Sequence, residues 1–100
     1  MLVAIASTSE DLNGEISNQG GRAPYYLLID NGELIKSIKN PFAKGGGGAG
    51  FAVAKLLEQN NVKKIVIGNI GDNMLSALKD KNIIFENADG EIKAYLKAQK

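Results

Sequence analysis

The sequence predicts an α/β domain in which a five-stranded mixed sheet carries helices on both faces. Apolar segments of strand and helical character follow one another in the order βββαβαβα. An Asn-Gly dipeptide at Asn31 and Gly32 joins the second and third strand segments, as in a tight hairpin. The later strands are separated by helical segments, and right-handed crossovers of this kind give a three-layer α/β arrangement.

The strand segments are recognised by their apolar runs and their β-branched residues. The run from Leu2 to Ser7 reads as a buried strand, and the long polar segment from Thr8 to Gly21 reads as a loop. In the third strand segment, residues alternate from Glu33 to Lys39, so that Leu34 is expected on the face opposite Ile35 and Ser37. The remaining strands are expected at residues 25–30, 64–67 and 83–85.

The helical segments are bounded by glycine and asparagine. A glycine tract at residues 45–50 precedes an apolar helical pattern that starts at Phe51 and stops at Asn60 and Asn61. A second glycine turn, at residues 68–71, separates a strand from the next helix. The later helices are expected at residues 74–81 and 88–98.

Composition limits the kind of protein. The 100 residues are expected to form a single domain, and the net charge of +1 gives no electrostatic case for a nucleic-acid partner. There is no cysteine and no histidine, so thiolate and imidazole metal ligands are absent from the sequence. The apolar start of the chain lacks a basic segment, and no stretch reaches the length of a membrane helix. We therefore expect a cytoplasmic protein without a membrane partner.

The expected strand order places the glycine segments at one edge of the sheet. The end of the first strand at Ser7, the loop segment with Arg22, the glycine tract and residues 68–71 all fall at the carboxyl edge. Open α/β sheets bind ligands outside the carboxyl ends of their strands. The topology and the positions of the glycines therefore predict the same candidate site.

The glycine segments suggest an anion site made largely of backbone. Glycine before a helix leaves the N–H groups of the first turn free, at the positive end of the helix dipole. The candidate ligand-binding glycines are Gly45, Gly46, Gly47, Gly48, Gly50 and Gly71. Two other roles remain open at this point: a mobile connection, with Gly50 required only for close helix packing, and a tight turn at residues 68–71 that satisfies local structure alone.

Three polar side chains complete the candidate site. Arg22 is the only arginine, and its planar guanidinium suits bidentate binding of anions; its alternative role is an ion pair with Glu15 that orders the loop. Asn69 lies in the second glycine turn, where its carboxamide is available to orient a ligand. Ser7 ends the first strand and has either a ligand-binding or a loop-capping role.

Three segments in this order resemble the dinitrogenase iron-molybdenum cofactor biosynthesis family. They are Gly21-Arg22-Ala23-Pro24-Tyr25-Tyr26, Gly47-Gly48-Ala49-Gly50, and Gly68-Asn69-Ile70-Gly71 with Asn73. The resemblance covers nearly the whole chain. It implies a ribonuclease H-like fold and a role in carrying the iron-molybdenum cofactor or its precursor, with cofactor-assembly proteins as partners.

The chain departs from this family at positions that matter for ligation. Family members often carry His-Phe where this sequence has Gln19 and Gly20, and many place a histidine in the glycine tract, where this sequence has Lys44 and glycines. Nuclease chemistry on this fold requires clustered carboxylates for two metal ions, whereas the first strand contains no acid. No nucleophile–base pair is evident either, so we expect no enzyme activity.

Two functions follow from these observations. The first is a non-catalytic domain that binds an anionic iron-molybdenum or iron-sulfur cluster, or a precursor of one, through Arg22 and the glycine turns, without direct metal ligands. The second is a small regulatory or protein-interaction module that binds a simple oxyanion or a partner protein and has lost cluster ligation.

Overall fold

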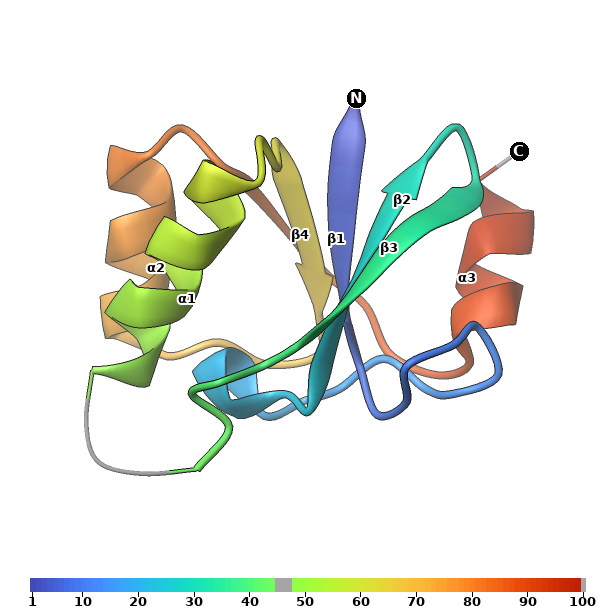
Figure 1. Cartoon of the computed structure of the whole chain (residues 1–100), viewed down its shortest axis with the longest axis horizontal. Coiled ribbons are helices and arrows are strands. Elements are labelled where there is room, and N and C mark those ends of the chain that lie inside the picture. The colour runs from blue at the N-terminus through green and yellow to red at the C-terminus, as the bar shows by residue number, and fades with distance from the viewer. Residues whose placement is uncertain (45–47, 100) are drawn as a thin grey trace.

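The computed structural model of the chain describes residues 1–44 and 48–99. Figure 1 shows three layers, with α1 and α2 on one side of the central sheet and α3 on the other. This arrangement confirms the predicted α/β class. In chain order the elements are β1 (Leu2–Ser7), the 3-10 helix η1 (Gly20–Arg22), β2 (Tyr25–Asp30), β3 (Glu33–Lys39), α1 (Ala49–Gln59), β4 (Lys64–Ile67), α2 (Asp72–Asp80), β5 (Ile84–Asn87) and α3 (Ile92–Ala98).

The sheet has the strand order β3-β2-β1-β4-β5. β2 is antiparallel to both of its neighbours, whereas β1, β4 and β5 are parallel to one another. This is the order of a ribonuclease H-like sheet, as the resemblance implied. β1 lies in the centre, which explains why the run from Ala4 to Ser7 is buried on both faces.

The two faces of the sheet support separate cores. Ala4 and Ala6 of β1 face α1 and α2, and their small side chains leave room for the helices above them. Ile5 faces the other way and packs with Ile16, Leu27 and Ile92 beneath α3. The alternation of β1 side chains therefore divides the core into two clusters.

The β2–β3 hairpin confirms the predicted turn and corrects the predicted alternation. Asn31 and Gly32 have φ angles of 51° and 80°, the positive values that a type I′ turn requires. A bulge then shifts the register, because Leu34 pairs with Ile29 while Lys36 pairs with Leu28. Ile35 is the extra residue, and it is 60% exposed. Leu34 therefore shares a face with Ser37, and the predicted opposite placement was wrong.

The helix boundaries differ from the predicted ones by a few residues. α1 begins two residues before Phe51 and α2 begins two residues before Met74. The largest difference is in α3, which begins at Ile92 instead of residue 88. The reason is a turn at Gly90, whose φ of 89° interrupts the helical pattern, while the Gly90 carbonyl accepts a hydrogen bond from the Ile16 N–H at 2.9 Å. Within residues 1–44 and 48–99, no helix is long and apolar enough to cross a bilayer.

Candidate functional site

A groove of about 390 Å³ opens at the carboxyl edge of the sheet, between η1 and the first turns of α1 and α2. We call it the rim groove. Figure 1 shows how the elements that form it meet: both helices begin at the lower edge of the view, where η1 also lies. The residues that line the rim groove are Asn18, Gln19, Gly20, Gly21, Arg22, Ala49, Gly50, Asn69, Gly71, Asn73 and Met74.

Two glycines allow η1 to approach α1 closely. Gly20 has a φ of 57°, a left-handed conformation that glycine adopts without strain. A Cβ atom built on Gly21 would lie 2.9 Å from the backbone carbon of Ala49 and 2.9 Å from the Gly50 nitrogen. Only glycine fits at this contact, which brings the next residue, Arg22, to the helix N-terminus.

Two buried side chains hold this segment in place. The Asn40 carboxamide donates from Nδ2 to the carbonyls of Gly21 at 2.8 Å and Ala23 at 2.9 Å, while its Oδ1 accepts the Phe42 N–H at 2.9 Å. The Tyr26 hydroxyl donates to the Gly20 carbonyl at 3.0 Å. Burial raises the pKa of Tyr26, so the phenol keeps its proton and remains a donor. The end of β3 and the start of β2 therefore fix the position of η1.

Arg22 is partly buried at the wall of the rim groove. Its Nη1 donates to the Phe42 carbonyl at 3.5 Å, which ties the guanidinium to the segment that follows β3. Glu15, the carboxylate considered as its alternative partner, lines a neighbouring hollow with Thr8 and Pro24. That hollow, of about 310 Å³, shares Asn18 and Gln19 with the rim groove.

Two helix N-termini meet at the rim groove, and both have glycine as the N-cap. The first intrahelical bonds run from Ala52 N–H to the Gly48 carbonyl and from Leu75 N–H to the Gly71 carbonyl. The N–H groups before Ala52 and Leu75 have no such partner within their helices. Glycine has no side chain with which to cap them. The groove thus combines first-turn N–H groups that have no partner within their own helices, two positive dipole ends and a guanidinium, with Asp72 in the first turn of α2 as the nearby negative charge.

The structure separates packing glycines from a glycine that faces open space. A Cβ atom on Gly50 would lie 2.7 Å from the Met74 Cβ, so Gly50 permits the close packing of α1 on α2. Gly68 has a similar role, because its Cβ would lie 3.1 Å from the Asn18 Cβ. At Gly71 no atom lies within 4 Å of such a Cβ, and its φ of −83° suits any residue. Packing therefore explains Gly50 and Gly68 but not Gly71.

The second glycine turn is fixed to the loop that forms the opposite wall. The Gly68 N–H donates to the Ser17 carbonyl at 2.8 Å, and the Ser17 N–H donates to the Ala6 carbonyl at 2.8 Å. Asn87 Nδ2 donates to the Gly68 carbonyl at 3.0 Å. These bonds position Asn69, whose exposed side chain lies at the groove.

Four of the predicted site residues converge on the rim groove: Arg22, Gly50, Asn69 and Gly71. Gly48 is the N-cap of α1, with a φ of 85°, and adjoins the groove through Ala49. Gly45, Gly46 and Gly47 lie outside the described residues. Ser7 is not among the lining residues. It is fully buried, and its hydroxyl donates to the Ser9 carbonyl at 2.6 Å and accepts the Ser9 N–H at 3.0 Å, which is the loop-capping alternative.

Sequence reasoning missed several residues of this site. Asn18, Gln19 and Asn73 place three further carboxamides in the groove. Gln19 is informative, because the family resemblance implies a histidine at or beside this position. Asn40 was interpreted only as the end of a strand before Pro41, and no local pattern indicated its three hydrogen bonds. Two of its three partners, the carbonyls of Gly21 and Ala23, lie far away in the sequence, so these bonds become visible only in the fold.

The donor set suits an anion better than a bare metal ion. The lining side chains include four carboxamides and one guanidinium, and no carboxylate. The sequence contains no cysteine or histidine, and within the described ranges no group of three or more acidic residues is placed to hold a metal ion. Direct ligation of iron or molybdenum by thiolate or imidazole is thus excluded, whereas hydrogen bonding to an anionic cargo is not.

The fold and the rim groove define a class: a small α/β domain with a backbone-rich, anion-compatible groove at the carboxyl edge of its sheet. The family model described as dinitrogenase iron-molybdenum cofactor matches residues 1–99, and the chain belongs to this family. The resemblance drawn from the three glycine segments is confirmed. Family membership links the chain to the handling of the iron-molybdenum cofactor.

Three solved structures share the fold of this chain. The NMR structure of a Thermotoga protein described as a candidate NifB protein is 26% identical, with a TM-score of 0.80 over 98% of this chain and 85% of that one. The apo form of the orange protein from Desulfovibrio gigas is 20% identical, with a TM-score of 0.85 over 98% of this chain and 88% of that one. The crystal structure of the protein PH0822 is 18% identical, with a TM-score of 0.81 over 99% of this chain and 89% of that one. A search of curated protein sequences found no match.

Proposed function

We propose that this protein is a non-catalytic carrier domain whose cargo is an anionic metal cluster of the iron-molybdenum or iron-sulfur type, or a precursor of one. The observation that supports this most directly is the convergence of Arg22 with the glycine-capped N-termini of α1 and α2 in the rim groove. Membership in the dinitrogenase iron-molybdenum cofactor family supplies the class of cargo.

The proposed mode of binding is through hydrogen bonds to the outside of a preassembled cluster. Sulfide and oxo groups at a cluster surface accept hydrogen bonds from backbone N–H groups, from carboxamides such as those of Asn69 and Asn73, and from the Arg22 guanidinium. Because the sequence contains no cysteine or histidine, the cargo arrives and leaves without exchange of such ligands. This mode suits transient carriage between cofactor-assembly proteins, which are the proposed partners.

The absence of a catalytic arrangement is part of the proposal. The side chains that line the rim groove are carboxamides, a guanidinium and apolar groups, none of which pairs a nucleophile with a general base. Asp30, the acid that ends β2, pairs in register with Leu2 at the start of β1, and therefore lies at the edge opposite the groove.

A second function is favoured by one specific observation. Gln19 lines the groove at the position for which the family resemblance implies an imidazole, and a carboxamide cannot replace imidazole as a strong ligand for iron. A domain with this substitution is suited to sensing a simple oxyanion, such as phosphate or molybdate, as a regulatory or interaction module.

An anaerobic amide NMR titration distinguishes the two functions. The probes are tetrathiomolybdate, a simple molybdenum–sulfur anion, together with molybdate and phosphate at the same concentrations. The carrier function predicts shifts of the Arg22, Gly50, Asn69 and Gly71 amides with tetrathiomolybdate at concentrations where the two oxyanions cause none. Equal shifts with all three probes support the oxyanion module. If none of the probes shifts these amides, both functions are wrong for this groove.

A further inference from the structure

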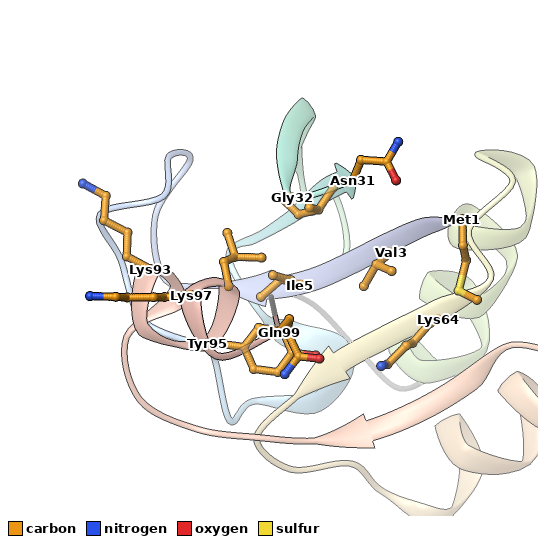
Figure 2. A pocket seen from close by; sticks show the side chains of 12 residues that line it. Met1, Val3, Ile5, Asn31, Gly32, Lys64, Lys93, Tyr95, Lys97 and Gln99 are labelled. Carbon is orange, nitrogen blue, oxygen red and sulfur yellow. The ribbon is translucent and has the colours of Figure 1, made fainter.

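The chain has a cavity of about 710 Å³ between β1 and α3, but little of its lining is available to a ligand. Ile5 and Ile29 are only 0% and 4% exposed. Figure 2 shows the Lys93 and Lys97 side chains at the outer side of α3, directed away from the cavity. A smaller hollow beside the rim groove presents its polar groups to solvent.

This hollow carries a charge opposite to that of the rim groove. We call it the Glu15 hollow; its volume is about 310 Å³, and its lining residues are Thr8, Glu15, Ile16, Ser17, Asn18, Gln19 and Pro24. Among the described residues, Glu15 is the only charged one that lines it, whereas the rim groove is lined by Arg22 and by no carboxylate. A negative and a positive hollow therefore adjoin each other at the carboxyl edge of the sheet.

The boundary between the two hollows is formed by Asn18 and Gln19, which line both of them. Both side chains are exposed carboxamides, so each offers an amide oxygen as acceptor and an NH2 group as donor. Groups of either charge can be hydrogen-bonded there. A small molecule that crosses this boundary therefore has one end in each hollow.

The backbone fixes the position of Glu15. Its N–H donates to Thr8 Oγ1 at 3.0 Å, and its carbonyl accepts the Thr8 N–H at 3.0 Å. The Ile16 N–H donates to the Gly90 carbonyl at 2.9 Å, which ties the segment to the turn before α3. The Glu15 side chain itself is exposed, so the carboxylate extends into solvent from a fixed backbone.

The Glu15 hollow suits an ammonium group. Within residues 1–44 and 48–99, no ion pair involves Glu15. An ammonium group has three donors and no acceptor, and the hollow offers acceptors in the Glu15 carboxylate, the Thr8 hydroxyl and the shared amide oxygens. A single carboxylate is a poor site for a metal ion, and no group of three acidic residues in the described part of the chain is placed to hold one.

We infer that the two hollows form one site for a compact zwitterion. Its oxyanion group lies in the rim groove, at Arg22 and the N-termini of α1 and α2, and its ammonium group lies in the Glu15 hollow. Opposite charges at the two ends determine the orientation of the ligand. This inference rests on the oxyanion function proposed above and specifies its ligand class: the phosphate ester of a short amino alcohol has this chemistry.

An amide NMR titration with two matched phosphate esters tests the site. Phosphoethanolamine carries both charges, and propyl phosphate has a methyl group in place of the ammonium. We expect phosphoethanolamine to shift the amides of Arg22 and Gly71 together with those of Thr8 and Glu15, whereas propyl phosphate shifts the Arg22 and Gly71 amides alone. Phosphoethanolamine is expected to bind about fivefold more tightly, the modest gain of a solvent-accessible charge pair.

The outcomes separate this inference from the function on which it rests. Equal affinities for the two esters, with shifts at the rim groove only, overturn the zwitterion site and leave the oxyanion function intact. Absence of shifts with both esters and with inorganic phosphate overturns both, and the response to tetrathiomolybdate then decides the carrier function alone.

A matched pair of charge variants tests the ammonium contact. Glu15→Gln removes the charge of the hollow at nearly constant size, and Glu33→Gln removes an exposed carboxylate that pairs in register with Asp30 at the opposite edge. In Glu15→Gln the preference for phosphoethanolamine over propyl phosphate is expected to fall from about fivefold to less than about twofold. In Glu33→Gln it is expected to stay at about fivefold, because salt screens a charge at that distance. An undiminished preference in Glu15→Gln overturns the placement of the ammonium group.

Discussion

The Asn40 carboxamide donates a hydrogen bond of 2.8 Å to the carbonyl of Gly21, which joins the end of β3 to the 3-10 helix that carries Arg22. Asn40 is only 4% exposed, and the same side chain also satisfies Ala23 and Phe42. One buried carboxamide thus holds a wall of the rim groove without lining it. The position of Arg22 depends on a residue that cannot touch the ligand.

Asn40→Ala is expected to lower the free energy of unfolding by about 2–4 kcal/mol, because it leaves two carbonyls and one N–H without their partner. Urea denaturation measures this loss. The control is Asn60→Ala, which removes a single hydrogen bond of 2.8 Å to the Leu56 carbonyl and is expected to cost about 1 kcal/mol. Equal losses in the two variants would show that Asn40 does not hold the wall as described.

Alanine at Gly50 is expected to lower the stability of the fold, whereas alanine at Gly71 is expected to weaken ligand binding. Gly50→Ala places a Cβ 2.7 Å from the Met74 Cβ and is expected to destabilise the fold by about 1–3 kcal/mol. Gly71→Ala meets no atom within 4 Å and has a compatible φ, so its stability should change by less than about 1 kcal/mol. Its methyl group nevertheless enters the rim groove, and tetrathiomolybdate binding should weaken. Thermal denaturation and the amide titration measure the two effects; unchanged binding in Gly71→Ala removes Gly71 from the site.

The sequence was sufficient for the parts of the fold that depend on local pattern. Asn31 and Gly32 specified the hairpin because few other dipeptides accept two positive φ angles. The apolar run of β1 indicated a buried strand, and the order of elements then placed Arg22, Gly50, Asn69 and Gly71 at one edge. These four residues lie together because strand direction, which follows from topology, determines the edge.

The parts that were missed depend on contacts between segments distant in sequence. The bulge at Ile35 arises from the pairing of β3 with β2, and alternation within β3 alone gives no sign of it. Ser7 has the right position along the chain, but its hydroxyl is taken up by Ser9. The cavity of about 710 Å³ that residues of β1 and α3 line, among them Val3 and Tyr95, was not predicted at all, because its form depends on how far α3 reaches over β1.

Glu86→Gln tests the ion pair between Lys64 and Glu86 through the pH dependence of the free energy of unfolding. The pKa of Glu86 is lowered from its ordinary 4.5, chiefly by the hydrogen bond from Lys64. The Glu86 carboxyl therefore holds its proton less tightly in the native state than in the unfolded state. For this reason the ionised Glu86 stabilises the native state above the ordinary pKa, and this stabilisation is lost as the pH falls through the lowered pKa. The Glu86 side chain is about a third exposed. At neutral pH the free energies of unfolding of the wild type and of Glu86→Gln should therefore differ by less than about 1 kcal/mol.

Urea denaturation at neutral pH and at about pH 3 measures this difference. We expect the wild type to be more stable than Glu86→Gln at neutral pH, and we expect the difference between their free energies of unfolding to become smaller in acid. Glu10→Gln, at an exposed position of the first loop, serves as the control and should show no comparable narrowing. A gap that stays constant across this range would mean that the Lys64–Glu86 pair does not contribute in the native state.

Arg22→Ala is expected to weaken tetrathiomolybdate binding by more than about tenfold, the loss typical of a hydrogen-bonded charge. The melting temperature should change little, because Asn40 and Tyr26 hold η1 through the backbone carbonyls of Gly21 and Gly20. Arg22→Lys keeps the charge but loses the planar fork, so an intermediate affinity is expected. Isothermal titration calorimetry measures the affinities, and an unchanged value in Arg22→Ala removes the guanidinium from the site.

Gln19→His tests whether the groove lacks only a metal ligand. Gln19 is exposed and lines the rim groove, so an imidazole at this position can reach a cluster bound there. With a synthetic iron-sulfur cubane that carries exchangeable thiolates, we expect the variant to bind at least about tenfold more tightly than wild type, through replacement of one thiolate by the imidazole. The gain in affinity should disappear below about pH 6.5, where the imidazole is protonated.

Gln59→His, at the far end of α1, is the matched control for Gln19→His. Absorption and NMR titrations follow both variants. An equal gain in the control, or a gain that persists in acid, would mean that the added histidine does not ligate a cluster in the rim groove.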